Sequence, residues 1–190
     1  QAAGLPTSCN QGFRGAALMA PELETDRLRL RLWREDDWHP LSHFFAEPKQ
    51  TNIMGGVSDA GFAWRVIACH VGHWQWRGYG MWALEEKANN ALAGFCGPWH
   101  PADWPELELG WSLLAKYRGR GLATEAAAAA RLDIDRELGL TTVVSYIEPS
   151  NMRSIAVAER LGCASEGETT LPSGTPALAY RHPSAAEVLH

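Results

Sequence analysis

The chain has 190 residues, of which 46% are hydrophobic and 21% charged, and its formal net charge is −5. This length and apolar fraction suffice for one globular domain with a core and exclude wholesale disorder. The acidic balance disfavours a nucleic-acid binder, which normally carries a basic excess. No apolar stretch approaches the roughly 18–20 residues of a membrane helix, so a membrane partner is not predicted.

Hydrophobic periodicity and turn signals, taken in chain order, predict a mixed α/β chain. Period-two alternation and β-branched runs predict strands at residues 27–32, 80–85, 92–96, 107–114, 141–147, 164–168 and 177–181. Helical spacing and cap signals predict helices at residues 35–45, 122–138 and 149–161, and one that begins at Ser58 or Asp59 after a break at Gly55-Gly56. Gly139 is expected to end the third helix as a left-handed cap. This order favours a mixed sheet with helices on its faces.

The two ends of the chain differ from its middle. Residues 1–21 are rich in Gly, Ala and small polar residues and lack the basic start and apolar middle of a signal peptide. We interpret them as a disordered extension and residues 183–190 as a tail. Residues 22–182 are predicted to form a single domain, because no repeat or linker divides them.

Cysteines and histidines are scattered along the chain. The four cysteines show no C-x-x-C spacing, which argues against a zinc knuckle and fits a reducing compartment such as the cytoplasm. The pairs His39 with His43 and His70 with His73 have helical spacing, but no third ligand accompanies either pair. We therefore predict a cytoplasmic protein without a metal site.

A Gly- and Arg-rich run joins the strand at residues 107–114 to the helix that follows it. The run consists of Arg118, Gly119, Arg120, Gly121, Leu122, Ala123 and Thr124. Glycine lets a backbone approach a ligand closely, and a helix N-terminus attracts anions. The run predicts a phosphate cradle, with a solvated surface turn as the alternative. It lacks the Lys of a Walker loop and the last Gly of a dinucleotide fingerprint.

The same run matches the pattern Arg-x-x-Gly-x-Ala, and three further stretches fit one family in the correct order. They are the segments 23–31, 108–111 and 151–163. On these motifs, residues 22–182 resemble the GNAT superfamily of acyl-CoA-dependent N-acyltransferases. They look most like its Rim-type branch, which acetylates the N-termini of ribosomal proteins.

The resemblance implies a GNAT fold, which is a mixed, mostly antiparallel sheet of about seven strands with helices on both faces. Its fourth and fifth strands are parallel and splay apart, and acetyl-CoA lies in the gap. The main chain of Leu113 and Leu114 would then pair with the pantetheine arm. The amides of the run from Arg118 into the helix start at Thr124 would hold the pyrophosphate, and Asn151 would contact the pantetheine arm from the other side.

Thioester aminolysis needs a neutral amine, so a base is useful near neutral pH. Glu108 is the predicted general base because the resemblance places it beside the gap. Glu106 has the same side-chain parity in the strand and is the reserve. A solvent-facing strand residue is the alternative reading of Glu108.

The proton donor for the departing thiolate is less defined by the sequence. Many members of the superfamily place a Tyr seven residues after the Asn, but this position is Ala158 here. Ser154 remains on the same predicted helix face and is the candidate acid, because Rim-type relatives use a serine in this region. A packing or capping role for Ser154, with solvent as the acid, is the alternative.

The predicted function is transfer of acetyl from acetyl-CoA to a primary amine, with a peptide or protein N-terminal α-amine as the acceptor. Asp103, Glu106 and Glu108 would attract a cationic acceptor, and Trp99, Trp104 and Trp111 would form an apolar wall, with a core role as their alternative. Alternative functions are a small-molecule N-acetyltransferase acting on an antibiotic, polyamine or amino acid, transfer of a longer acyl group, and a non-catalytic CoA-binding module. A homodimer is left open.

Overall fold

The computed structural model describes residues 21–46 and 60–184. The proposed extension, apart from residue 21, lies outside the described residues, and so do most of the proposed tail, the break at Gly55-Gly56 and the cap at Ser58 or Asp59. The element order is strand, helices, three strands, helix, strand, helix and two strands, as the sequence predicts, with one additional short strand at Leu23–Glu24 before the first predicted strand.

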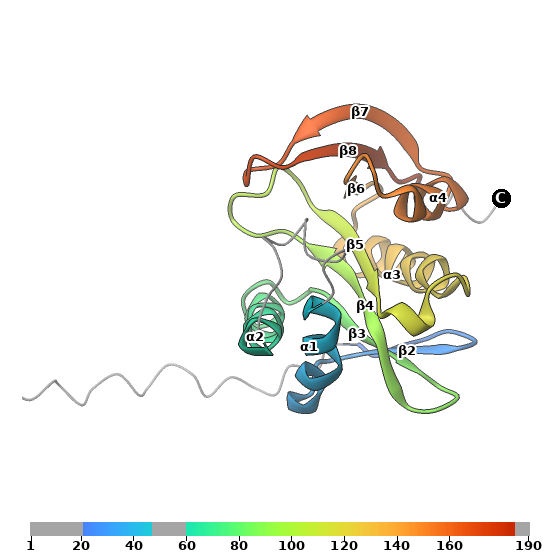
Figure 1. The fold of residues 1–190 in the computed structure, drawn as a ribbon. Helices are drawn as coiled ribbons and strands as arrows, with labels where there is room; N and C mark the ends of the chain where they lie inside the picture. Colours follow the sequence, from blue (N-terminus) through green and yellow to red (C-terminus); the bar gives the residue numbers. More distant parts are fainter. Residues whose placement is uncertain (1–20, 47–59, 185–190) are drawn as a thin grey trace, which may run out of the picture.

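One eight-stranded sheet runs through the described residues in the order β1-β2-β3-β4-β5-β6-β8-β7 (Figure 1). Its strands are β1 (Leu23–Glu24), β2 (Leu28–Arg31), β3 (Trp82–Glu86), β4 (Ala91–Trp99), β5 (Glu108–Leu113), β6 (Val144–Ile147), β7 (Ala164–Thr170) and β8 (Pro176–Arg181). Only β5 and β6 pair in parallel among these strands. This confirms the predicted mixed, mostly antiparallel sheet.

Helices cover both faces of the sheet, as predicted. Helices α1 (Trp38–Ala46) and α2 (Ala60–Arg77) lie on one side, and α3 (Leu122–Leu138) lies on the other (Figure 1). Helix α4 (Met152–Arg160) follows β6, and short 3₁₀ turns occupy Glu35–Asp37 and Ala115–Tyr117. No helix in the described ranges is long and apolar enough to cross a membrane.

Three strands differ from the sequence prediction for local reasons. Strand β1 precedes the predicted strand at residues 27–32 and pairs with it as β2, because the Thr25 hydroxyl closes a turn on Leu28 that folds β1 back on β2. Strand β4 continues through Pro98 because its β3 pairing already ends at Cys96, so the missing N–H costs no ladder bond. Strand β6 begins three residues late, because Thr141 and its neighbour are held by the Arg131 guanidinium instead.

The core forms two hydrophobic clusters. The larger one lies between the sheet and α1, α2 and α3, where the small side chains of Ala126, Ala127 and Ala130 are fully buried. The smaller cluster consists of Ile147, Ile155, Ala158 and Tyr180. Trp111 on β5 packs against both clusters, which places it where the two parts of the sheet meet.

Candidate active site

The parallel strands β5 and β6 separate almost as soon as they meet. Their only ladder pair is Glu108 with Val144, where the Val144 N–H donates to the Leu107 carbonyl at 3.3 Å. One residue later the ladder is replaced by a side chain, because the Ser145 hydroxyl donates to the Leu109 carbonyl at 2.6 Å. The predicted gap between these strands is therefore present beyond Leu109.

A buried histidine holds that side-chain bridge in place. His182 Nε2 lies 2.8 Å from the Ser145 Oγ, and the single hydroxyl proton of Ser145 already goes to Leu109. The ring nitrogen must therefore donate, which makes His182 a neutral Nε2–H tautomer. Burial lowers its pKa to about 4 and keeps it neutral.

Main-chain groups of alternate β5 residues face the gap. The Leu109 carbonyl does so through Ser145, and the Leu113 carbonyl accepts a 2.9 Å bond from Arg118 Nε. The Leu114 amide instead donates to Ala93 on β4 at 2.9 Å. Of the two residues expected to pair with a pantetheine arm, Leu113 faces the gap and the Leu114 amide faces the neighbouring strand.

The loop before α3 has the shape of an anion cradle. Gly119 and Gly121 adopt left-handed φ angles of 73° and 79°, and the first helical bond runs from the Glu125 N–H to the Gly121 carbonyl. No main-chain acceptor among the described residues receives the six amides from Gly119 to Thr124. The buried Thr124 Oγ1 also has no hydrogen-bond partner there. Six amides and a hydroxyl without acceptors match the needs of a phosphate group.

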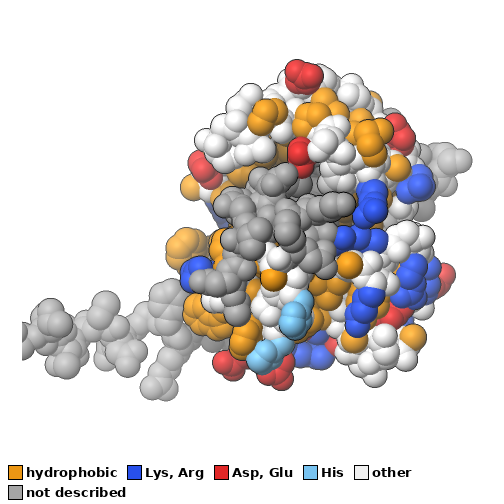
Figure 2. All heavy atoms as spheres, viewed as in Figure 1, with side chains coloured by type: hydrophobic (Ala, Val, Ile, Leu, Met, Phe, Trp, Pro, Cys, Tyr) orange, Lys and Arg blue, Asp and Glu red, His pale blue; other side chains and the backbone are white. Residues whose placement is uncertain are grey.

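The two arginines of the cradle are engaged by the protein itself. Besides its bond to Leu113, Arg118 lies over the ring of Phe44 at 5.8 Å. Arg120 forms an ion pair with Glu86. Figure 2 shows Lys and Arg side chains gathered beside the start of α3. An anion in this cradle would therefore be held first by the main chain and second by the surrounding positive charge.

Glu108 lies where β5 and β6 still touch, opposite Trp99 of β4. Its partly buried carboxylate accepts a 2.8 Å bond from the Trp104 indole N–H. Burial raises its pKa to about 7, while the Trp104 bond and the Tyr146 main chain hold the pKa down in part. A carboxyl group with this pKa exchanges protons near neutral pH, which suits a general base.

Glu106 has a different environment although it lies only two residues away. Arg181 holds it in a bidentate ion pair, with N–O distances of 2.6 and 2.8 Å. This ion pair keeps the pKa of Glu106 below its usual value. A carboxylate that is already stabilised by a guanidinium is a weak base, so the geometry favours Glu108 over the reserve candidate.

Comparison with known proteins identifies the fold. The acetyltransferase (GNAT) domain family matches residues 27–164. The chain belongs to this family. An acetyltransferase from Agrobacterium tumefaciens is 34% identical, with a TM-score of 0.77, and the match covers 90% of this chain and 99% of that one. YkkB of Bacillus subtilis is 29% identical over 74% of this chain and 84% of its own length. The protein is therefore an acyl-CoA-dependent acetyltransferase of the GNAT family.

Two solved structures of the same fold hold a CoA ligand. RimL, a ribosomal α-N-protein acetyltransferase in complex with coenzyme A, is 19% identical with a TM-score of 0.67, and the match covers 85% of this chain and 97% of that one. The microcin self-immunity acetyltransferase MccE, in complex with acetyl-CoA and AMP, is 16% identical with a TM-score of 0.65, with coverages of 84% and 93%. At these identities both comparisons describe the fold alone.

In this acetyltransferase, Asn151 is the residue just before α4 and Ser154 lies in the first turn of that helix. Asn151 caps this helix, because its Oδ1 accepts the Ser154 N–H at 3.2 Å, and its Nδ2 hydrogens remain available for donation. Ser154 is partly buried, and Ala158, one turn later, packs in the smaller core cluster. Glu108 and Ser154 therefore come from opposite sides of the gap, one on β5 and the other after β6.

The paired histidines do not form a metal site. No group of three potential ligands occurs in the described part of the chain. His70 is buried and stacks on Trp33 with ring centroids 5.3 Å apart, and its pKa is lowered to about 3, chiefly by burial. His73 accepts the His100 N–H at Nε2 and faces the Tyr79 carbonyl through Nδ1, which makes it a neutral Nδ1–H tautomer.

The three tryptophans proposed as an acceptor wall occupy different places. Trp99 stacks on His73 at 4.7 Å, and Trp111 lies between the two core clusters. Trp104 contacts the Glu108 carboxylate directly, which sequence reasoning missed. The bridging Ser145 was also missed, because its partners lie 36 and 37 residues away and no sequence spacing announces them.

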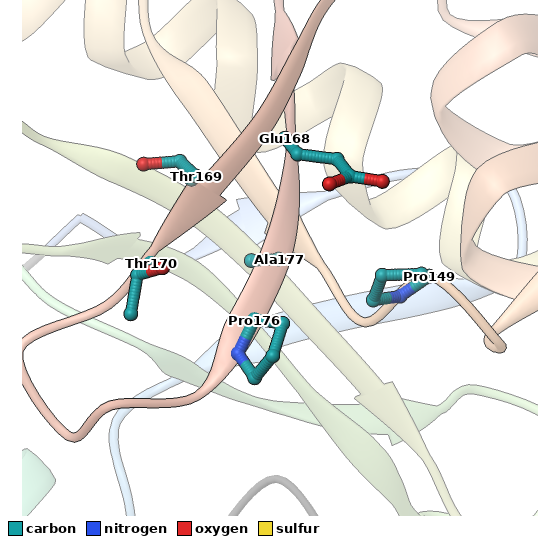
Figure 3. Close-up of a pocket in the computed structure, with 6 residues that line it drawn as sticks. All are labelled: Pro149, Glu168, Thr169, Thr170, Pro176 and Ala177. Carbon is teal, nitrogen blue, oxygen red and sulfur yellow. The ribbon is translucent and has the colours of Figure 1, made fainter.

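A shallow pocket lies near the tip of the β7–β8 hairpin (Figure 3). Its lining residues are Pro149, Glu168, Thr169, Thr170, Pro176 and Ala177. Pro149 belongs to the segment between β6 and α4, so the pocket joins the hairpin to the chain that leaves the gap.

Proposed function

We propose that this acetyltransferase transfers the acetyl group of acetyl-CoA to a primary amine, with the α-amine of a peptide or protein N-terminus as the acceptor. The observation that carries this proposal is the Glu108 carboxyl group. It lies where the two parallel strands part, its pKa is about 7, and no ion pair with a basic side chain contributes to that value. We also propose that residues 22–182 form the catalytic domain and that this domain belongs to the Rim-type branch of the family.

Acetyl-CoA, when bound, supplies the thioester carbonyl that the amine attacks. The amides of Gly119 to Thr124 and the Thr124 hydroxyl would hold its pyrophosphate, and the Leu113 main chain and the Asn151 amide would hold its pantetheine arm. Ionised Glu108 takes one proton from the attacking amine as the new C–N bond forms. When the C–S bond breaks, the Ser154 hydroxyl or solvent donates a proton to the thiolate.

The properties of Glu108 match an α-amine better than a lysine side chain. A free α-amine has a pKa of about 7.7–8.0 and a lysine amine about 10.4, so a base whose conjugate acid has a pKa of about 7 matches the first better than the second. Arg181 offsets the charge of Glu106, so a cationic acceptor would be attracted mainly by Glu108 and Asp103. Trp104 and Trp99 flank this carboxylate and provide apolar surface for the first side chain of a peptide.

Acetylation of matched peptides tests this proposal. Each peptide carries one internal Lys and has either a free or a blocked N-terminus, and acetyl-CoA turnover is followed for both. We expect product only from the free N-terminus. Equal rates on both peptides would assign the lysine side chain as acceptor. Turnover of a polyamine, an amino acid or an aminoglycoside without turnover of any peptide would establish the small-molecule alternative. CoA binding without turnover of any amine would establish a binding module.

A further inference from the structure

Trp104 lies in the loop between β4 and β5 and reaches both strands that form the gap. Its indole N–H donates to Glu108 Oε2 on β5 at 2.8 Å. Its ring meets Tyr146 on β6 edge-on, with centroids 6.3 Å apart. The loop is closed locally by a bond from the Trp104 N–H to the Pro101 carbonyl at 3.1 Å. The indole is thus held by two side-chain contacts, and the Trp104 main chain is held by a third, before any substrate binds.

The two oxygens of the Glu108 carboxylate have different surroundings. Trp104 holds Oε2, whereas Oε1 lies over Gly110, where a Cβ atom would be 3.8 Å away. A side chain at Gly110 would also collide with the Met81 methyl group, so this side of the strand is kept free of a further side chain. The Tyr146 main chain also contacts this carboxylate, and the oxygen over Gly110 is the one that the Trp104 indole leaves free to accept a proton.

The titratable groups that surround Glu108 supply no competing positive charge. Burial raises the pKa of the Tyr146 phenol to about 12, so it is neutral. Glu106, on the loop just before β5, is bound to Arg181. On the α2 side, His73 stacks on Trp99 and its pKa is lowered, chiefly by burial. The Trp104 indole is the side chain that stabilises the ionised form of Glu108.

We propose that Trp104 is a positioning residue for the base. Its indole N–H fixes one oxygen of Glu108, directs the other toward the acceptor amine and makes the carboxyl group acidic enough to be ionised near neutral pH. This inference rests on the proposed function of Glu108. It goes beyond that function in assigning the protonation of the base to a residue on a different element.

The proposal predicts a change in the pH profile rather than a uniform loss of activity. Without the indole donor the pKa of Glu108 rises, by about one unit for a partly buried charge-assisted hydrogen bond. The ionised fraction below the pKa then falls roughly tenfold. Above the new pKa the carboxylate is fully ionised and more basic, so activity recovers. A purely structural role of Trp104 would lower kcat/KM at every pH.

The test compares Trp104→Phe, which removes the donor, with Trp104→Gln, which keeps an N–H donor. Trp33→Phe is the matched control, because Trp33 donates an equally short 2.8 Å indole bond to the Met81 carbonyl, away from Glu108. Each folded protein carries ¹³C-labelled glutamate carboxyl groups, with Glu108→Gln to assign the signal. NMR titration then gives the pKa of Glu108, and kcat/KM is measured from pH 5.5 to 9.5.

We expect Trp104→Phe to raise the NMR pKa and to move the acidic limb of kcat/KM by the same amount. At pH 6 its kcat/KM should be about tenfold below that of the wild type, and within about twofold at pH 9. Trp104→Gln and Trp33→Phe should keep the NMR pKa of Glu108 and the pH of the acidic limb near those of the wild type, whereas the pH-independent level of kcat/KM in Trp104→Gln should fall because the apolar surface of the indole is lost. An unchanged NMR pKa in Trp104→Phe would overturn the proposal. A raised NMR pKa with an unmoved rate limb would instead overturn the role of Glu108 as base, and with it the catalytic role of Trp104.

Discussion

Environment, rather than residue type, separates the two carboxylates at the start of β5. Glu106, on the loop just before β5, and Glu108, the first residue of β5, are two residues apart, but Arg181 binds only the first in a bidentate pair. Glu108 accepts a neutral indole donor in its place. The pKa of Glu106 is consequently lowered and that of Glu108 is raised to about 7. The loop before β5 therefore carries an ion-paired carboxylate, and the first residue of β5 carries a titratable one.

This contrast makes a prediction for catalysis. Glu108→Gln keeps the shape of the side chain and removes its basicity, so kcat/KM should fall about 10²–10⁴-fold and the acidic limb of the pH profile should disappear. Calorimetry should give nearly unchanged CoA affinity, because the cradle is on another element. Glu106→Gln is the matched control and should keep the acidic limb. Loss of that limb in Glu106→Gln and its retention in Glu108→Gln would reverse the assignment.

Sequence reasoning found Glu108 through family resemblance but could not see its partners. The bond from Trp104 depends on how a loop with three prolines closes, and no local signal encodes that closure. Arg31 shows the same limit. Its place in an alternating strand predicts a half-buried position, yet it is buried and paired with both Asp37 and Glu85. Glu85 lies 54 residues away, and only the β2–β3 register brings them together.

Among the elements, α3 was the most predictable. Its predicted bounds, Leu122 to Leu138, match the structure, and Gly139 ends it with a left-handed φ of 66°. Both ends are set by local signals, since a glycine supplies a left-handed conformation at each. Strands β5 and β6 were less predictable. Their separation is bridged by Ser145 on β6 and by His182 just after β8, and the sequence contains no pattern that pairs these two residues.

The two glycines at the ends of α3 allow a matched test of the cradle. Gly121 and Gly139 both have left-handed φ angles, so Val at either position is strained to a similar degree. Gly121→Val should weaken CoA binding at least tenfold, about 1.4 kcal/mol, because its side chain obstructs the amides around it. Gly139→Val should lower thermal stability comparably without changing CoA affinity in calorimetry. Equal CoA affinity in both variants would place the pyrophosphate elsewhere.

Across the whole molecule, the gap lies between two packed bodies. In the larger cluster, side chains of strands β1 through β5 pack against those of helices α1, α2 and α3. In the smaller cluster, side chains of β6 and β8 pack against those of α4. Trp111 and the Ser145–His182 bridge are shared by the two bodies, while Arg181 ties Glu106 and Glu166 together at the end where the strands still pair. The sheet is thus fastened at the base of the gap and parts beyond it, where the amides that we propose for the cradle have no main-chain acceptor among the described residues.

Protons bound at buried titratable groups act on stability in opposite directions. His70 and His182 have pKa values of about 3 and 4 in the fold, compared with about 6.5 when unfolded. The stability that their neutral rings contribute is complete above pH 6.5 and is lost as the pH falls. Glu108 behaves oppositely, because its pKa is raised to about 7. Its contribution is complete below about pH 4.5 and is lost as the pH rises through 7.

The stability of the Glu108→Gln and Glu106→Gln variants should therefore differ in sign at pH 8. Glu108→Gln replaces a partly buried, desolvated charge with a neutral amide, so this variant should unfold at a higher temperature than the wild type. Its free energy of unfolding should exceed that of the wild type by on the order of 1–2 kcal/mol after allowance for solvent access. Near pH 5, where Glu108 is protonated, the difference should shrink.

Glu106→Gln removes one of the two ion-pair partners of Arg181 and should unfold at a lower temperature than the wild type at pH 8. Its free energy of unfolding should be lower by up to about 1 kcal/mol. Thermal unfolding of both variants from pH 5 to 8 measures this. A destabilised Glu108→Gln at pH 8 would mean that the carboxylate is better solvated or paired than its surroundings imply, and would remove the energetic cost that we associate with keeping a base at this position.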